Sequence, residues 1–158
     1  MSEYFPLQAG RFWEYDSDSS RGRRRVRVEI VSVEDDRGTT RASGRSRVGE
    51  GSWLEFSVVE DGSSLRVEGV VEFPLPPVVG AAWDAAGDAL RIDSSRARAE
   101  VPAGRFTDCL RVVVLIAGGD AGTGERLYAP GVGLVSETLS DEGEPSQRVL
   151  VSYGMTEI

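Results

Sequence analysis

The sequence predicts an all-β, mainly antiparallel fold: a single-domain meander that forms an open or closed barrel or a sandwich. Short stretches with period-2 alternation of apolar residues recur along the chain, which is typical of half-buried strands. Turns that contain Gly, Pro or Asp separate these stretches at short intervals. At most one short helix fits, between Ala81 and Leu90, where alanine is frequent. Counting the stretches gives about nine to eleven strands.

The first strands are expected within residues 11–48. Trp13 and Tyr15 fall on the same face of an extended segment, where they either pack in the core or line a ligand groove. From Arg23 to Ile30, apolar and charged residues alternate, as in a strand with one buried face. A charged turn at residues 34–38 leads into a polar strand from Thr39 to Val48.

Arginines dominate one parity of these two polar strands. If the pairing register places the arginine parities of the two strands on the same side of the sheet, six arginines share one face: Arg23, Arg25, Arg27, Arg41, Arg45 and Arg47. Such a face needs either counter-charges, from Glu29 and acids of neighbouring strands, or an anionic ligand. Arg25, Arg27, Arg45 and Arg47 are therefore candidate ligand-binding residues.

The middle of the chain repeats the pattern of its beginning. A strand that starts at Trp53 turns at Asp61-Gly62 into a returning strand from Leu65 to Phe73. The segment 73–83, with Phe-Pro-Leu followed by Gly-x-x-Trp, then repeats the segment 5–13. This repeat predicts two similar meander halves, about 4–72 and 73–156, within one domain spanning 1–158. Trp53 and Trp83 join Trp13 as candidates for lining a ligand groove in an open barrel.

The last third contains the most apolar run. Residues 110–116 carry apolar side chains on both parities, which predicts a central strand buried on both faces over part of its length. The glycine-rich residues 117–124 form a hairpin loop and not a phosphate loop, because no Gly-Lys-Ser/Thr follows. An acidic loop at residues 140–146 precedes the last strand, from Gln147 to Thr156.

Composition excludes several chemistries. The 158 residues contain no histidine, one cysteine and no lysine, since all 18 basic residues are arginines. Ser-His and Cys-His pairs, Schiff-base lysines, internal disulfides, multi-cysteine zinc sites and metal sites that depend on histidine are thereby excluded. Cys109 is expected to be a small buried residue. The sequence predicts no catalytic residue, no metal and no cofactor. It therefore favours a binding module over an enzyme.

Three motifs in order resemble a family of small uncharacterised bacterial β-proteins, many of which carry export or lipoprotein signals. The motifs are YFPLxxGxxWxY at residues 4–15, PAGxFxxCxxV at residues 102–112 and YxxGVGLV at residues 128–135. The resemblance spans almost the whole chain and implies an exported or envelope-associated β-domain. It supplies no catalytic residues.

These observations favour a domain that binds an apolar or amphipathic ligand or a protein partner. The alternatives are an enzyme that uses carboxylates or arginines on an anionic substrate, and a structural domain that self-associates, for example as a homodimer. A net charge of −8 disfavours nucleic-acid binding, and no apolar stretch reaches the length of a membrane span. Without a basic start or an apolar run at the N-terminus, we expect a cytoplasmic protein, or an exported or envelope protein if a leader was removed.

Overall fold

A computed structural model describes residues 3–115, 122–141 and 145–156 and confirms the all-β prediction. Twelve antiparallel strands form one sheet, and the described residues contain no helix. Of the expected loops at 117–124 and 140–146, residues 117–121 and 142–144 lie outside the described residues, whereas residues 122–124, 140–141 and 146 belong to strands. The strands are β1 Arg11–Ser19, β2 Gly22–Asp36, β3 Thr39–Val48, β4 Leu54–Glu60, β5 Ser64–Val67, β6 Val70–Pro74, β7 Ala82–Ala85, β8 Asp88–Val101, β9 Gly104–Leu115, β10 Gly122–Ala129, β11 Gly133–Asp141 and β12 Ser146–Met155.

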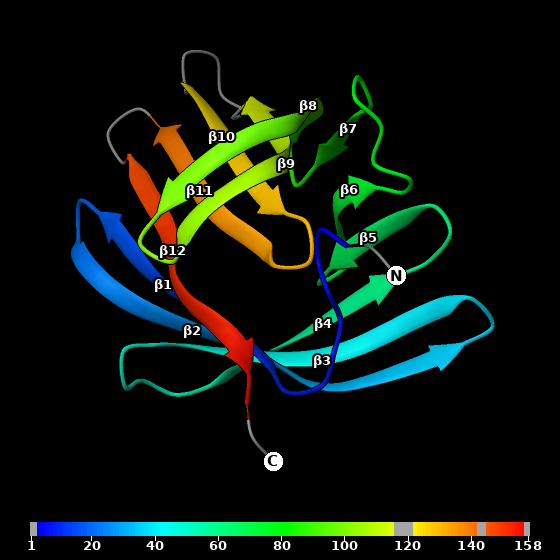
Figure 1. The fold of residues 1–158 in the computed structure, drawn as a ribbon, viewed down its shortest axis with the longest axis horizontal. Helices are drawn as coiled ribbons and strands as arrows, with labels where there is room; N and C mark the ends of the chain where they lie inside the picture. The colour runs from blue at the N-terminus through cyan, green and yellow to red at the C-terminus, as the bar shows by residue number, and fades with distance from the viewer. Residues whose placement is uncertain (1–2, 116–121, 142–144, 157–158) are drawn as a thin grey trace.

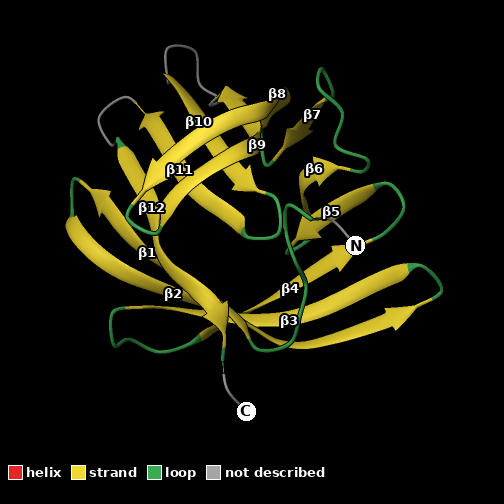
Figure 2. Cartoon of the chain, viewed as in Figure 1, coloured by secondary structure: helices red, strands yellow, loops and turns green. Residues whose placement is uncertain are grey.

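The sheet curls into a nearly closed barrel whose strand order is β6-β5-β4-β3-β2-β1-β12-β11-β10-β9-β8-β7 (Figures 1 and 2). The first and last strands, β1 and β12, pair at the centre of this order, from Arg11↔Met155 to Ser19↔Ser146. The two edges, β6 and β7, are consecutive in the chain. They meet at a seam where Trp83 Nε1 donates a hydrogen bond to the Val71 carbonyl at 3.1 Å.

One turn that the sequence did not predict raises the number of strands above the predicted range. Glu68 and Gly69 both have positive φ, 51° and 78°, and they split the predicted strand 65–73 into β5 and β6. Ala86 and Gly87, with φ of 52° and 89°, make the same kind of turn between β7 and β8. The segment Ala81 to Leu90 is therefore a hairpin, and no helix forms there.

The repeated Gly-x-x-Trp segments make equivalent turns. The N–H of Gly10 bonds to the Ile30 carbonyl at 2.8 Å, and that of Gly80 bonds to the Ile92 carbonyl at 2.9 Å. The φ angles, 93° at Gly10 and 97° at Gly80, lie where glycine is favoured. Each turn leads into the strand that carries Trp13 or Trp83. The similarity of the two meander halves, about 4–72 and 73–156, stays a prediction.

The core lies inside the barrel and is supplied by inward-facing residues of nearly every strand. Its largest fully buried side chains include Tyr128, Phe73, Leu7, Ile30, Leu65, Ile92, Leu110 and Leu150. Leu7 belongs to the N-terminal segment. This segment crosses between the first half of the barrel, β1 to β6, and the second half, β7 to β12 (Figure 1). Cys109 is fully buried, and burial together with Asp108 raises the pKa of its thiol. This environment is typical of a packing residue and not of a nucleophile.

No helix among the described residues is long and apolar enough to cross a bilayer.

Candidate functional site

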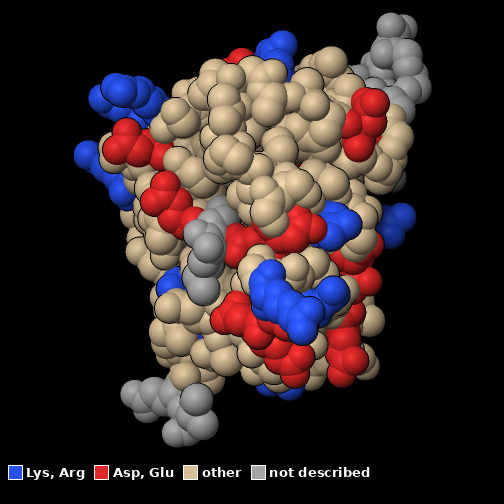
Figure 3. Space-filling model, turned by 90° about the vertical axis from the view of Figure 1, so that its right-hand side faces the viewer, with Lys and Arg blue, Asp and Glu red and all other residues tan. Residues whose placement is uncertain are grey.

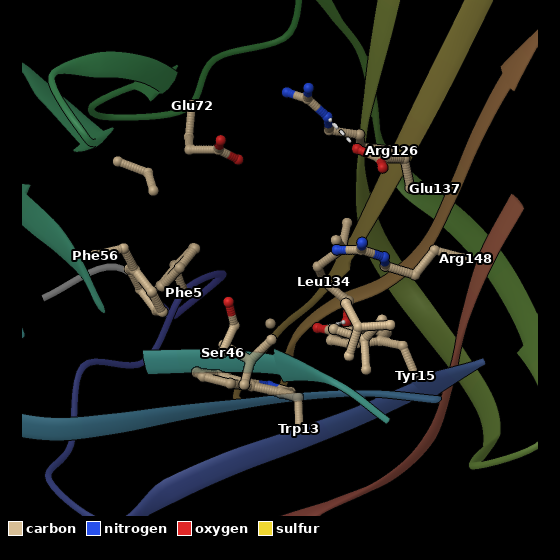
Figure 4. A pocket seen from close by; sticks show the side chains of 15 residues that line it. Phe5, Trp13, Tyr15, Ser46, Phe56, Glu72, Arg126, Leu134, Glu137 and Arg148 are labelled. Atoms are coloured by element: carbon tan, nitrogen blue, oxygen red, sulfur yellow. Dashed lines mark hydrogen bonds and ion pairs between the residues drawn. The ribbon is translucent and has the colours of Figure 1, made fainter. Parts of the chain in front are cut away.

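A cavity of about 310 Å³ lies between the two halves of the barrel (Figure 4). Its wall comes from strands far apart in the sequence because the β1–β12 pairing folds the meander back on itself. The lining side chains fall into two groups, an apolar group and a charged group. The apolar group comes mainly from β1 to β5 and includes Trp13, Tyr15, Val26, Val28, Val48, Phe56 and Val67.

Trp13 and Tyr15 connect the first half of the barrel to the second. Trp13 Nε1 donates a hydrogen bond to the Val132 carbonyl at 2.6 Å, and the Tyr15 hydroxyl donates one to the Leu134 carbonyl at 2.8 Å. Burial raises the pKa of Tyr15, so the hydroxyl stays a donor at neutral pH. Phe5 packs edge-on against Trp13, with 6.0 Å between ring centroids. Two hydrogen bonds and a ring contact therefore position these aromatic side chains.

Two glycines permit this aromatic packing. A Cβ on Gly44 would clash with Cζ of the Phe56 ring, so the ring lies directly against the β3 backbone. A Cβ on Gly133 would lie 3.0 Å from Trp13 Nε1. Both glycines thus let an aromatic ring lie against the backbone, and each ring borders the cavity.

Three members of the charged group, Arg126, Glu137 and Arg148, lie on β10, β11 and β12, and the fourth, Glu72, lies across the cavity on β6 (Figure 4). Arg126 Nε donates to Glu137 Oε2 at 2.8 Å, as the dashed line in Figure 4 shows. Across the cavity, Glu72 Oε2 accepts a hydrogen bond from the hydroxyl of Tyr128 at 2.7 Å. The Arg148 guanidinium lies over the Tyr15 ring, 5.7 Å from its centroid. The cavity therefore has an apolar wall that faces a polar one.

Electrostatics keep Arg126 charged. Burial opposes the charge of Arg126, but Tyr128, Glu72 and Glu137 outweigh burial and raise the pKa of the guanidinium. Burial, followed by the charge of Glu72, raises the pKa of Tyr128 well above its ordinary value. Arg126 is thus a fixed cation and Tyr128 a fixed hydrogen-bond donor at neutral pH.

The structure distributes the predicted tryptophans over three environments. Trp13 lines the cavity together with Tyr15. Trp83 lies half-buried at the β6–β7 seam. The guanidinium groups of Arg45 and Arg47 lie over the Trp53 ring, 4.1 and 4.6 Å from its centroid. Neither Trp53 nor Trp83 is among the residues that line the cavity.

The predicted arginines lie on the outer face of β2 and β3. Arg27 pairs directly with Arg47, and Arg45 pairs with Glu29, so the strands meet in the register that places these residues on one face. Carboxylates accompany them: Arg25 binds Asp16 at 2.8 Å, and Arg27 and Arg45 bind Glu29 at 2.6 and 2.8 Å. Figure 3 shows that acidic and basic residues are also intermingled on the side of the molecule that it presents. The counter-charges expected as one alternative are present, so this face does not require an anionic ligand.

Replacing Glu29 by glutamine should lower the free energy of unfolding by about 1–2 kcal/mol at pH 7, because Arg27 and Arg45 lose their shared carboxylate. Burial alone would raise the pKa of Glu29, but the hydrogen bonds and charges of the two arginines outweigh it and lower the pKa. A carboxyl with a lowered pKa stabilises the fold above the ordinary pKa of about 4.3 and loses this effect as pH falls through the folded-state value.

Urea unfolding between pH 7 and pH 3 checks this prediction. The stability difference between wild type and Glu29→Gln should be constant above about pH 5 and shrink below about pH 4. Glu50→Gln, in the exposed turn after β3, matches the change in net charge. A difference that persists unchanged to pH 3 would contradict the role assigned to Glu29.

The polar wall was not among the sequence predictions. Arg126, Glu137 and Arg148 lie on the neighbouring strands β10, β11 and β12, whereas Glu72 lies on the edge strand β6 and comes close to them only because the barrel closes. The available signal was a charged residue on the inward parity of an otherwise apolar strand, as with Arg148 two residues before the fully buried Leu150. Reading that signal requires knowing which parity faces inward.

Fold and cavity define a class of protein: a small, nearly closed antiparallel barrel with an amphipathic interior site. Solved structures of the same fold include a proposed exported protein of Bacteroides fragilis with a YmcC-like fold, at 12% identity and a TM-score of 0.67, covering 98% of this chain and 100% of that one. A proposed lipoprotein of Parabacteroides distasonis has 14% identity and a TM-score of 0.60, covering 96% and 98%. The sequence matches no protein-family model and no curated protein.

These likenesses establish the fold. They also agree with the broad resemblance seen in the sequence, since both neighbours are bacterial β-proteins described as exported or as a lipoprotein. They do not test the three sequence motifs on which that resemblance was based. They give no support to the cytoplasmic location expected from the N-terminal residues.

Proposed function

We propose that this protein is a non-enzymatic binding module that holds a small amphipathic molecule inside its barrel. The observation that carries the proposal is the two-sided cavity, with aromatic and aliphatic side chains on one wall and Glu72, Arg126, Glu137 and Arg148 on the other. Pockets for small ligands combine an apolar lining with a few placed polar groups. The apolar wall would bind the body of the ligand, and the polar wall would orient its head.

The size of the cavity limits the ligand. A volume of about 310 Å³ corresponds to about ten water-sized units of ~30 Å³ each. A ligand of about ten non-hydrogen atoms therefore fits, such as an eight-carbon chain with a polar head. Larger molecules would have to extend past Val48, which is partly exposed at the rim.

The two alternative functions have less support. An enzyme that uses the predicted arginines lacks its main motivation, because Arg25, Arg27 and Arg45 bind carboxylates on the outer face. Self-association and binding of a protein partner stay predictions.

We further propose that the protein acts outside the cytoplasm, in the cell envelope. The support is the description of its structural neighbours as an exported protein and a lipoprotein. Fractionation of the source cells tests this location, and recovery in the cytoplasmic fraction alone would refute it.

Binding of 1-octanol, measured by calorimetry and by amide chemical shifts, tests the interior site. Wild type should bind, and Ser46→Phe should weaken binding at least about tenfold, because Ser46 lines the cavity and the new ring fills it. Ser43→Phe is the matched control, since Ser43 is exposed on the outer face of the same strand. Its affinity should stay within about twofold of wild type.

Ser46→Phe could fail for a trivial reason, namely loss of the fold. Val48→Trp provides a second block at the more tolerant rim of the same cavity, and unfolding curves verify that each variant is folded. The proposed function is wrong if wild type binds no eight-carbon amphiphile at millimolar concentration, whether its head group is neutral, anionic or cationic. It is also wrong if the outer-face variant loses as much affinity as the two cavity variants.

A further inference from the structure

Three charged residues form a row across neighbouring strands on the polar wall of the cavity. In the strand register Arg126 of β10 is opposite Glu137 of β11, and Glu137 is opposite Arg148 of β12. The row thus runs cation, anion, cation. Its single carboxylate forms its hydrogen bond with Arg126 Nε, at 2.8 Å.

The second carboxylate of the cavity, that of Glu72, also interacts with the surroundings of Arg126. Glu72 accepts the hydrogen bond of Tyr128, whose ring is fully buried and packs edge-on against Phe73 at 5.2 Å between centroids. Figure 4 shows the Glu72 carboxylate across the cavity, facing Arg126. Both carboxylates of the lining therefore belong to the environment of Arg126.

Arg148 differs from Arg126 in this respect. It is half-buried and lines the cavity, and its guanidinium lies over the Tyr15 ring. Among residues 3–115, 122–141 and 145–156, no carboxylate forms a salt bridge with it. This cation–π contact leaves the N–H donors of the guanidinium available. Arg148 is the cation of the cavity that has this free capacity.

We propose that the ligand is a monocarboxylate of about ten non-hydrogen atoms, whose carboxylate binds Arg148 and whose apolar body lies on the wall formed by Trp13, Val28 and Phe56. This inference rests on the proposed function and names the ligand class for it. A guanidinium binds a carboxylate through two parallel hydrogen bonds, which fits one free arginine. A cationic head group would be repelled by both arginines of the row, so a cation is disfavoured.

Charge also argues against a dianionic head such as a phosphate monoester. Arg148 is the arginine of the lining that pairs with no carboxylate among the described residues, so one negative charge can be placed there. A second charge would lie near Glu137, the cross-strand neighbour of Arg148, without a further free cation among the described residues. Repulsion of this kind is a common source of specificity.

The test compares four probes that share an eight-carbon chain: octanoate, 1-octanol, octylammonium and octyl phosphate, each titrated at pH 7. Wild type should bind octanoate about 10- to 100-fold more tightly than 1-octanol, as expected for a hydrogen-bonded charge pair. Arg148→Gln should remove this preference while leaving the affinity for 1-octanol within about twofold. Arg148→Lys should restore part of it, because lysine keeps the charge but not the bidentate geometry.

Arg98→Gln is the matched control, since Arg98 is exposed on β8 and its loss changes the net charge equally. It should keep the full preference for octanoate. Unfolding curves establish that Arg148→Gln is folded, and its retained binding of 1-octanol shows that the cavity is intact. A preference for octanoate that survives Arg148→Gln would overturn the assignment.

The outcomes separate this inference from the proposed function. Equal affinities for octanoate and 1-octanol in wild type would leave the interior binding site in place and refute the carboxylate head. Tighter binding of octylammonium or octyl phosphate would refute it as well, in favour of that other head group. Absence of binding by all four probes would refute the proposed function itself.

Discussion

Replacing Phe73 by alanine is expected to lower the free energy of unfolding by about 3–5 kcal/mol. Phe73 is fully buried, although β6 is an edge strand of the sheet. Its ring packs edge-on against Tyr128 of β10, with 5.2 Å between centroids. The contact therefore joins the first half of the barrel to the second at the side opposite the β1–β12 pairing. Its loss creates a cavity and loosens the seam at once.

Urea unfolding measures this effect, and Phe106→Ala provides the comparison. Phe106 is half-buried, and its ring contacts the exposed Tyr153 at 6.1 Å. Its removal should cost about 1 kcal/mol, because little buried volume is lost. Amide exchange of β6 should also accelerate in Phe73→Ala. Equal destabilisation by the two variants would show that Phe73 does not hold the barrel closed.

Much of the fold could be predicted from local patterns. The alternation between Arg23 and Ile30 corresponds to β2, whose buried residues Val26 and Ile30 face the interior. The Asp61-Gly62 signal correctly marked the turn between β4 and β5. By contrast, the turn at Glu68-Gly69 was hidden, because the apolar residues on either side of it read as one continuous alternation.

Closure into a barrel was beyond local reasoning. It depends on the pairing of β1 with β12, which brings Trp13 opposite Tyr153 across almost the whole length of the chain. Hairpins predict which consecutive strands are neighbours, but they carry no information about pairing between the first and last strands. Barrel and sandwich therefore stayed equivalent until the strand order was known.

The same limitation explains the mixed result at the site. Trp13 and Tyr15 were identified from their shared parity in one strand, and both line the cavity. Trp53 has the same parity as Glu55, which pairs with Arg45 on the outer face, so it stacks with arginines outside the barrel. Arg148 attracted no attention because the apolar parity of its strand, with Val149, was the more obvious feature.

Gly133→Ala is expected to lower the free energy of unfolding by about 2–3 kcal/mol and to weaken binding of 1-octanol severalfold. Gly133 has a φ of 115°, which a residue with a Cβ adopts only under strain, and that Cβ would lie 3.0 Å from Trp13 Nε1. Trp13 donates its hydrogen bond to the neighbouring Val132 carbonyl, so its ring cannot retreat without losing that bond. The displaced ring would move into the cavity that it lines.

Gly131→Ala in the same turn separates strain from the contact with Trp13. Gly131 also has a positive φ, 77°, but a Cβ there would meet open space. This variant should lose roughly 1–2 kcal/mol from strain and keep the wild-type affinity for 1-octanol. Unfolding curves and octanol titrations of the two variants measure both effects. Equal binding by both would mean that the position of Trp13 does not control the cavity. A selective loss in Gly133→Ala would show that the turn between β10 and β11 sets the shape of the binding site through one indole ring.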